Sequence, residues 1–236
     1  MADQKRLADT LEHYDLPKNP LGEIFKAQKR FGSKFCDFDS IGLDKKNSFR
    51  HATLPMCESD VTEWKNVFLD CIEDEISEIR GWIPWKHWKK YEGFEVDVVE
   101  LRFELIDILH FIISEFLIFK WDEKEVFNFF DVNVEVDKAD SLDALLYKVK
   151  GQQMARMLCD PSLHRPTQVK ETIKGLRNLI KLVGKGYEDP TNGKTFKDIM
   201  YVLFDLFVLW GMTGSDVYDY YMSKNKENFN RQERRY

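Results

Sequence analysis

Two pairs of carboxylates in this chain have the spacing and surroundings to hold a metal ion. Glu75 and Glu78 are three residues apart, and so are Glu104 and Asp107. Residues three apart share one face of a helix, so each pair would point both acids in one direction. The second pair lies within an apolar run, LRFELIDILHFIISEFL, where an unpaired buried carboxylate is strongly unfavourable. These acids need a compensating partner, and a divalent cation is the first candidate.

The types of the donor atoms indicate which cation. Two such pairs facing each other would repel and would raise one another's pKa unless cations neutralise them. All four donors are carboxylates, without a set of histidines or cysteines, which favours Mg²⁺ or Mn²⁺ over zinc. Two hard cations there would suit phosphoryl chemistry, because they bridge phosphate oxygens and lower the pKa of a bound water. The simpler interpretations are solvated acidic pairs and salt bridges to Lys or Arg.

Two basic segments accompany these acids. The first follows Glu78 and alternates aromatic rings, which can stack on a base, with ammonium groups: Trp85, Lys86, Trp88 and Lys89. The second is the carboxyl tail, YYMSKNKENFNRQERRY, in which Lys224, Asn228 and Arg231 are four and three residues apart and share a helical face. A basic tail is often only a solvated surface, but here it supplies the positive charge that a triphosphate needs beside the acids.

Helical periodicity dominates the chain, and strand-like alternation is scarce, so the sequence predicts an all-α fold. We expect a helix after Pro20, and another beginning at Asp122 as its N-cap. The other expected helices cover about 59–79, 96–120, 141–158, 166–183, 197–211 and 215–229. Gly81 and Pro84 should end the helix at about 59–79. Turns are expected at 160–161, 184–186 and 189–193.

Composition excludes several classes of protein. With 236 residues, 43% of them hydrophobic, the chain can bury a large core, and its net charge of −6 argues against nucleic acid as a partner. The four cysteines have no CxxC spacing, which fits a reducing compartment. Neither a signal-peptide core nor an uncharged apolar run of membrane-spanning length is present, so we expect a cytoplasmic protein with no membrane partner. Rossmann, P-loop and GxSxG motifs are missing as well.

The ordered motifs resemble a known family. The Glu75-x-x-Glu78 pair followed by PWKHWKK, then FELIDILHF with Glu104 and Asp107, then KNKENFNRQERRY, are similar to the dimeric dUTPases of the all-α NTP pyrophosphatase superfamily. The similarity extends to the bifunctional dCTP/dUTP pyrophosphatases of tailed phages. It includes the early NPLGEIFKAQKRF, where Gln28 matches a family glutamine that contacts the pyrimidine.

This resemblance implies a fold and a reaction. The fold would be a single all-α catalytic domain over 1–236, a helical bundle with a variable, mobile insertion at 121–195. The protein would be a homodimer and a dUTP diphosphatase, which hydrolyses dUTP to dUMP and pyrophosphate with Mg²⁺. The four acids would be the metal ligands and Glu78 also the general base. The substrate would be bound by Gln28, Trp85, Lys86, Trp88, Lys89, Lys224, Asn228 and Arg231.

Departures from the family pattern leave alternatives open. Phe31-Gly32 stands where the family usually has Leu-Asn, and the tail lacks the usual glycine before its final tyrosine. The nearest alternative is the same chemistry on dCTP, alone or together with dUTP. A pyrophosphatase for modified nucleotides is another. A different class would be a non-catalytic, nucleotide-binding dimer that keeps the acids as structural salt bridges.

Overall fold

The computed structural model describes residues 7–34, 61–86, 88–92, 94–132, 138–153, 165–188 and 194–234. These residues form eight α-helices and a short 3-10 helix, η1 (Leu7–Thr10), with no strand among them, so the all-α prediction is confirmed. The helices are α1 (Pro20–Gly32), α2 (Val61–Gly81), α3 (Val98–Ile118), α4 (Glu123–Phe129), α5 (Ser141–Gln153), α6 (Arg165–Glu188), α7 (Lys194–Leu209) and α8 (Gly214–Glu233).

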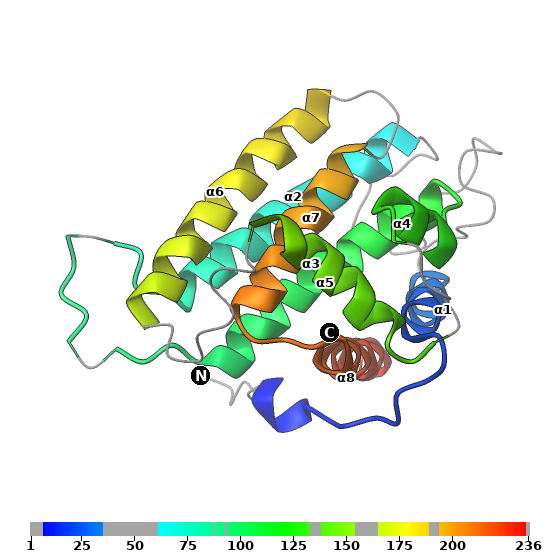
Figure 1. The fold of residues 1–236 in the computed structure, drawn as a ribbon, viewed down its shortest axis with the longest axis horizontal. Helices are drawn as coiled ribbons and strands as arrows, with labels where there is room; N and C mark the ends of the chain where they lie inside the picture. Colours follow the sequence, from blue (N-terminus) through cyan, green and yellow to red (C-terminus); the bar gives the residue numbers. More distant parts are fainter. Residues whose placement is uncertain are drawn as a thin grey trace.

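Helix α3 lies at the centre of the molecule. It contacts α2 and α7 on one side and α1 and α8 on the other, while α6 packs against both α2 and α7. In Figure 1 the helices α2, α6 and α7 run across the view, whereas α1 and α8 are seen nearly end-on. Because it is enclosed on several sides, α3 is buried almost throughout, with Leu105, Ile108 and Ile112 fully inaccessible. The acids Glu100, Glu104, Asp107 and Glu115 of α3 are therefore buried inside the protein.

Local sequence signals set most helix ends. Pro20 occupies the first turn of α1, where its missing N–H leaves no hydrogen bond unmade. Asp122 caps α4 as predicted, in a reciprocal capping box with Glu125. Helix α2 ends at Gly81, also as predicted.

One predicted turn is wrong. The glycines at 184 and 186 were expected to end a helix, but α6 continues to Glu188. Gly186 is buried, and a Cβ atom there would lie 2.8 Å from a methyl group of Leu69 on α2. This glycine permits close packing of α6 against α2 and does not form a turn. The predicted turns at 160–161 and 189–193 lie outside the described residues.

Residues 121–195 include α4, α5 and α6, which pack against the remaining helices, and the single domain and mobile insertion remain predictions.

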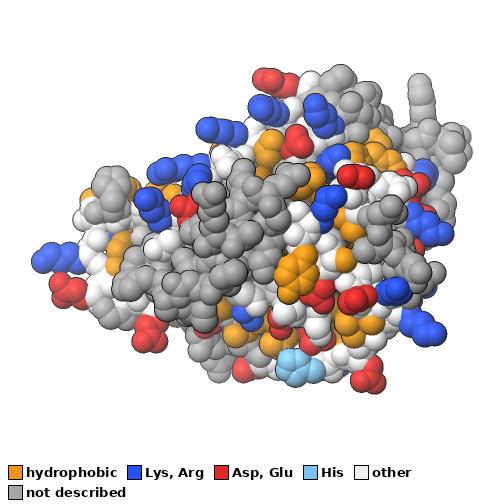
Figure 2. All heavy atoms as spheres, viewed as in Figure 1, with side chains coloured by type: hydrophobic (Ala, Val, Ile, Leu, Met, Phe, Trp, Pro, Cys, Tyr) orange, Lys and Arg blue, Asp and Glu red, His pale blue; other side chains and the backbone are white. Residues whose placement is uncertain are grey.

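Cys71 is an unpaired thiol, and the other cysteines lie outside the described residues. None of the described helices combines the length and apolarity needed to cross a bilayer. Acidic and basic side chains are interspersed on the face drawn in Figure 2.

Candidate active site

Three carboxylates converge where α2 packs against α3. Glu75 and Glu78 come from α2 and Glu104 from α3, and one oxygen of each lies within 4.8 Å of the other two. Glu104 is buried, Glu75 is half-buried and Glu78 is exposed. The cluster therefore extends from the protein interior at Glu104 to the solvent-exposed surface at Glu78. The structure brings together three of the four acids predicted from the sequence.

The fourth acid, Asp107, has a different partner. It lies about one turn along α3 from Glu104 and forms a buried ion pair with Lys224 of α8. Side chains of both residues are less than a tenth exposed. The negative charge of Asp107 still reaches the cluster, because it raises the pKa of Glu75. Lys224, which the sequence analysis assigned to phosphate, is here the counter-ion of Asp107.

The cluster is short of positive charge. Burial, followed by the charges of Asp107, Glu104 and Glu78, raises the pKa of Glu75 to about 9. Burial raises the pKa of Glu104 to about 7, and it raises that of Asp107 against the opposing effect of Lys224. A hard divalent cation can neutralise a set of carboxylate oxygens in which burial raises the pKa values of Glu75 and Glu104. The residues present therefore fit Mg²⁺.

Trp82 is part of this site and was not predicted. Its indole Nε1 donates a hydrogen bond of 3.0 Å to Oε1 of Glu104. This bond holds one oxygen of the carboxylate and lowers its pKa against the effect of burial. Trp82 is four residues after Glu78, a spacing that would place both on one face of a continuous helix. Helix α2 ends at Gly81, however, so helical spacing could not be used to predict the position of Trp82.

The loop after α2 carries the predicted aromatic and basic side chains. The rings of Trp85 and Trp88 meet edge to face at 5.9 Å, and Trp88 is 65% exposed. Arg80 and Lys86 lie over the Trp85 ring at 5.7 and 5.2 Å from its centroid. Lys89, in the same loop, is exposed. The structure thus gathers two cations around an accessible indole ring, while binding of a base by these residues remains a prediction.

Gln28 of α1 faces inward, toward α3 and α8. Its Oε1 accepts hydrogen bonds from the hydroxyl of Tyr221 at 2.7 Å and from Nδ1 of His110 at 2.8 Å, and its Nε2 donates to Ser114 Oγ at 2.7 Å. His110 also stacks on the Tyr221 ring, and burial lowers the pKa of this histidine to about 3, which keeps it neutral. His110 and Tyr221 each lie three residues from a member of the buried Asp107–Lys224 pair, so Gln28 is anchored about one turn away from that pair.

The remaining predicted residues lie on α8. Arg231 is half-buried, donates from Nε to Glu227 at 3.3 Å, and lowers the pKa of Asp107 through its charge. Asn228 lies between Lys224 and Arg231 on the same face and is half-buried. Lys224 and Arg231 thus both lie on α8, and the charges of both lower the pKa of Asp107.

Comparison with known proteins finds similarity over most of the chain. A family model described as dUTPase matches residues 39–236, which include every predicted site residue except Gln28. A dCTP pyrophosphatase of Enterobacteria phage T4 is 31% identical over 93 residues, covering 30% of this chain and 54% of the phage protein. The chain thus spans about half the length of this curated relative.

Proposed function

The chain belongs to the dUTPase family, and we propose that it is a Mg²⁺-dependent nucleoside triphosphate pyrophosphatase that hydrolyses dUTP to dUMP and pyrophosphate. The observation that carries this proposal is the cluster of Glu75, Glu78 and Glu104 beside the buried Asp107–Lys224 pair. A site with raised carboxyl pKa values on one side and cationic side chains on the other suits a substrate that arrives as a complex of metal and phosphate.

Each acid has a proposed role. Glu75, Glu78, Glu104 and Asp107 would hold Mg²⁺, which supplies neutralisation of phosphate charge and a lowered pKa for the attacking water. Glu78 is the exposed member of the cluster, so it is the acid best placed to accept a proton from that water. Trp82 fixes the Glu104 carboxylate by its hydrogen bond and thereby limits the directions in which that acid can ligate.

The cationic residues would bind the phosphates. Lys224, Asn228 and Arg231 present two charges and an amide along one face of α8. Lys224 has one ammonium group for two anionic partners, Asp107 and a phosphate. Binding of a triphosphate therefore requires that the charge of Asp107 be neutralised in another way, which makes phosphate binding depend on the cation.

We assign the nucleoside end of the substrate to Gln28 and to Trp85, Lys86, Trp88 and Lys89. Exposed indole rings can stack on a base, and an amide can read the base edge by hydrogen bonds. A closed pocket without room for a 5-methyl or a 2′-hydroxyl group would reject thymine and ribose.

The second candidate is hydrolysis of dCTP, alone or together with dUTP. It is favoured by the similarity to the T4 protein, whose name is dCTP pyrophosphatase. Uracil and cytosine differ at position 4, where one has a carbonyl acceptor and the other an amino donor. A side-chain amide can serve either base according to its orientation, and that of Gln28 would have to exchange its present partners Tyr221, His110 and Ser114 for the base edge.

The test is release of pyrophosphate from dUTP, dCTP, dTTP and UTP, each with and without Mg²⁺. We expect Mg²⁺-dependent turnover of dUTP. Equal turnover of dCTP would establish the dual activity, and turnover of none of the four would favour a binding protein or an enzyme for modified nucleotides.

The variant Glu78→Gln should lose at least about a hundredfold in kcat yet still bind dUTP. Glu73→Gln, an exposed acid on the same helix outside the cluster, is the matched control. Full activity of Glu78→Gln would remove Glu78 from its role as base.

A further inference from the structure

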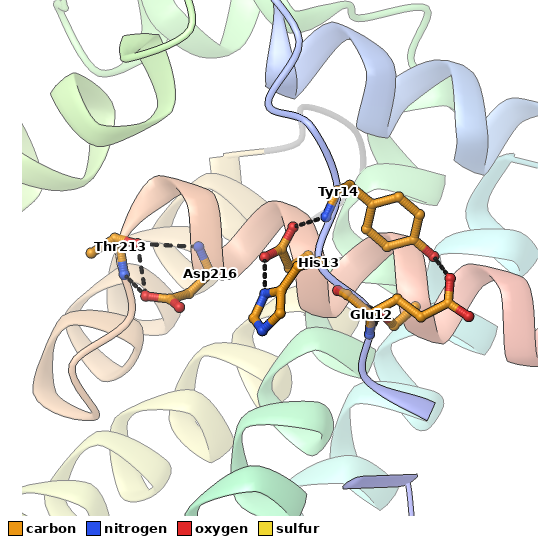
Figure 3. Close-up of polar contacts among 7 residues, drawn as sticks. Glu12, His13, Tyr14, Thr213 and Asp216 are labelled. Carbon is orange, nitrogen blue, oxygen red and sulfur yellow. Dashed lines mark hydrogen bonds and ion pairs between the residues drawn. The ribbon is translucent and has the colours of Figure 1, made fainter. Parts of the chain in front are cut away.

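The N-terminal segment formed by residues 12–14 binds along the outer face of α8. Figure 3 shows Glu12, His13 and Tyr14 lying against this helix, and Figure 1 shows the N-terminal chain passing beneath α8 on its way to α1. The backbone N–H of Tyr14 donates to Asp219 Oδ1 at 3.0 Å, and that of Glu12 donates to Ser223 Oγ at 2.8 Å. The main chain of the segment is thus held by side chains of α8.

The spacing of these two bonds fits the geometry of both partners. Asp219 and Ser223 are four residues apart, a rise of about 6 Å along a helix. Glu12 and Tyr14 are two residues apart, which extended chain spans in about 6.6 Å. Two N–H groups of the segment therefore meet successive turns of α8. Because both bonds are made at once, they fix where the segment lies along the helix.

The acceptors on α8 are buried. Ser223 is 1% exposed and Asp219 is 6% exposed, so each needs a hydrogen-bond partner inside the protein. Nδ1 of His13 lies 2.8 Å from the second oxygen of Asp219, and Glu12 pairs with Lys226 at 2.6 Å. The segment supplies the polar partners of a face of α8 that would otherwise be costly to bury.

This outer face lies directly beside the phosphate-binding face proposed above. Ser223 is adjacent in sequence to Lys224, and Lys226 is only one residue from Glu227, the partner of Arg231. On the inner side, the Tyr221 hydroxyl is bonded to Gln28 of α1. Helix α8 is therefore held from two sides, and a rotation that released the outer face would also turn the Lys224 ammonium away from Asp107.

We propose that residues 12–14, acting through Asp219 and Ser223, are positioning residues that set the rotation of α8 and so present Lys224 to the substrate phosphates. This inference rests on the proposed function. The segment lies outside the part of the chain that the family model matches, residues 39–236.

The test uses full-length variants of the two buried acceptors. Ser223→Ala removes the acceptor for Glu12, and Asp219→Ala removes the acceptor for Tyr14, while Asp219→Asn keeps an oxygen at that position. We expect KM for the triphosphate to rise about fivefold to tenfold in both alanine variants, the loss typical of a hydrogen bond, with kcat changed less. Asp219→Asn should restore most of the affinity. Binding of dUMP, which lacks the terminal phosphates, should weaken less than binding of pyrophosphate.

A matched control separates positioning from general loss of stability. Thr213 and Asp216 form the capping box at the start of α8, away from the 12–14 segment (Figure 3). Thr213→Ala should lower the melting temperature comparably and leave KM near its original value. An equal rise of KM in Thr213→Ala, or an unchanged KM in both alanine variants, would overturn the proposal.

A readout without turnover distinguishes this inference from the proposed function. Amide hydrogen exchange over residues 224–233 should accelerate in Ser223→Ala and not in Thr213→Ala, whatever the substrate. If the unmodified protein hydrolyses no nucleotide, the proposed function fails, and the exchange experiment still tests whether the segment holds α8. Unchanged exchange in Ser223→Ala would refute the holding role itself.

Discussion

Glu75 and Glu104 retain protons near neutral pH, because burial and neighbouring acids raise their pKa values to about 9 and about 7. Burial raises the pKa of Asp107 as well, and the charges of Lys224 and Arg231 oppose that shift. A cation that enters the cluster must displace these protons, so it competes with them for the same oxygens. The four acids therefore depend on an added cation for neutralisation, because the nearby positive charges, those of Lys224 and Arg231, act mainly on Asp107.

This competition predicts that Mg²⁺ binds more tightly as pH rises. Between pH 6 and 9 the apparent affinity should increase by up to about tenfold per pH unit wherever one proton is displaced. A carboxyl whose pKa is raised by folding stabilises the folded state below its unfolded pKa, and this contribution is lost as pH rises through 7 and 9. The metal-free protein should therefore become less stable over that range.

The measurement is the melting temperature at pH 6, 7.5 and 9, with Mg²⁺ or with NaCl of equal ionic strength. The increase caused by Mg²⁺ should be largest at pH 9, about 5 °C or more when Mg²⁺ is a hundredfold above its dissociation constant. An increase that is the same at pH 6 and 9, or that NaCl reproduces, would show that the raised acids do not bind the cation.

At the scale of helices, the two glycines near the end of α6 have opposite surroundings. A Cβ atom on Gly186 would lie 2.8 Å from Leu69 and 3.2 Å from Thr195, whereas one on Gly184 would meet nothing within 4 Å. Both positions are helical, so alanine should gain the same conformational entropy at each. The difference between the two substitutions therefore measures how closely α6 packs against its neighbours.

We predict that Gly184→Ala raises the free energy of unfolding by about 0.5–1 kcal/mol, the ordinary helical gain. Gly186→Ala should lower it by about 1–3 kcal/mol, because the added methyl group overpacks the contact with Leu69. Urea denaturation of the two variants, compared with the unmodified protein, tests both values. If Gly186→Ala is as stable as Gly184→Ala, then glycine is not needed for the contact between α6 and α2.

Helix ends could be predicted from the sequence where the residues that set them act locally. Pro20, Gly81 and Asp122 act on the helix that contains or follows them, so local patterns located those ends. Gly186 acts on a residue more than a hundred positions away, and no local pattern distinguishes such a glycine from a turn. The i,i+3 spacing predicted that Glu75 and Glu78 share one face of α2, whereas their approach to Glu104 of α3 was expected from the family resemblance. The Asp107–Lys224 pair and the Trp82 bond depend on how the helices pack.

At the scale of the whole molecule, three of the five exposed large hydrophobic side chains among the described residues lie in one segment. Trp85, Trp88 and Phe94 are 36%, 65% and 41% exposed, and all three lie in the segment between α2 and α3. Contiguous exposed apolar surface on a protein of this size commonly binds a ligand or another protein. The two tryptophans are assigned above to the base of the substrate, which leaves Phe94 at the far end of the segment.

We propose that the protein is a homodimer, as in the dimeric dUTPases that it resembles, and that Phe94 is covered by the partner. Sedimentation equilibrium at micromolar concentration should then give twice the 28.1 kDa of one chain, and the melting temperature should rise with protein concentration. Phe94→Ser should weaken the dimer by about tenfold or more, since burial of an aromatic side chain contributes about 1.5–3 kcal/mol. Tyr147→Ser, which alters a 61% exposed ring on α5, should leave the mass unchanged. A 28.1 kDa species throughout the concentration series would contradict the dimer, whereas a dimer insensitive to Phe94→Ser would place its interface on another surface.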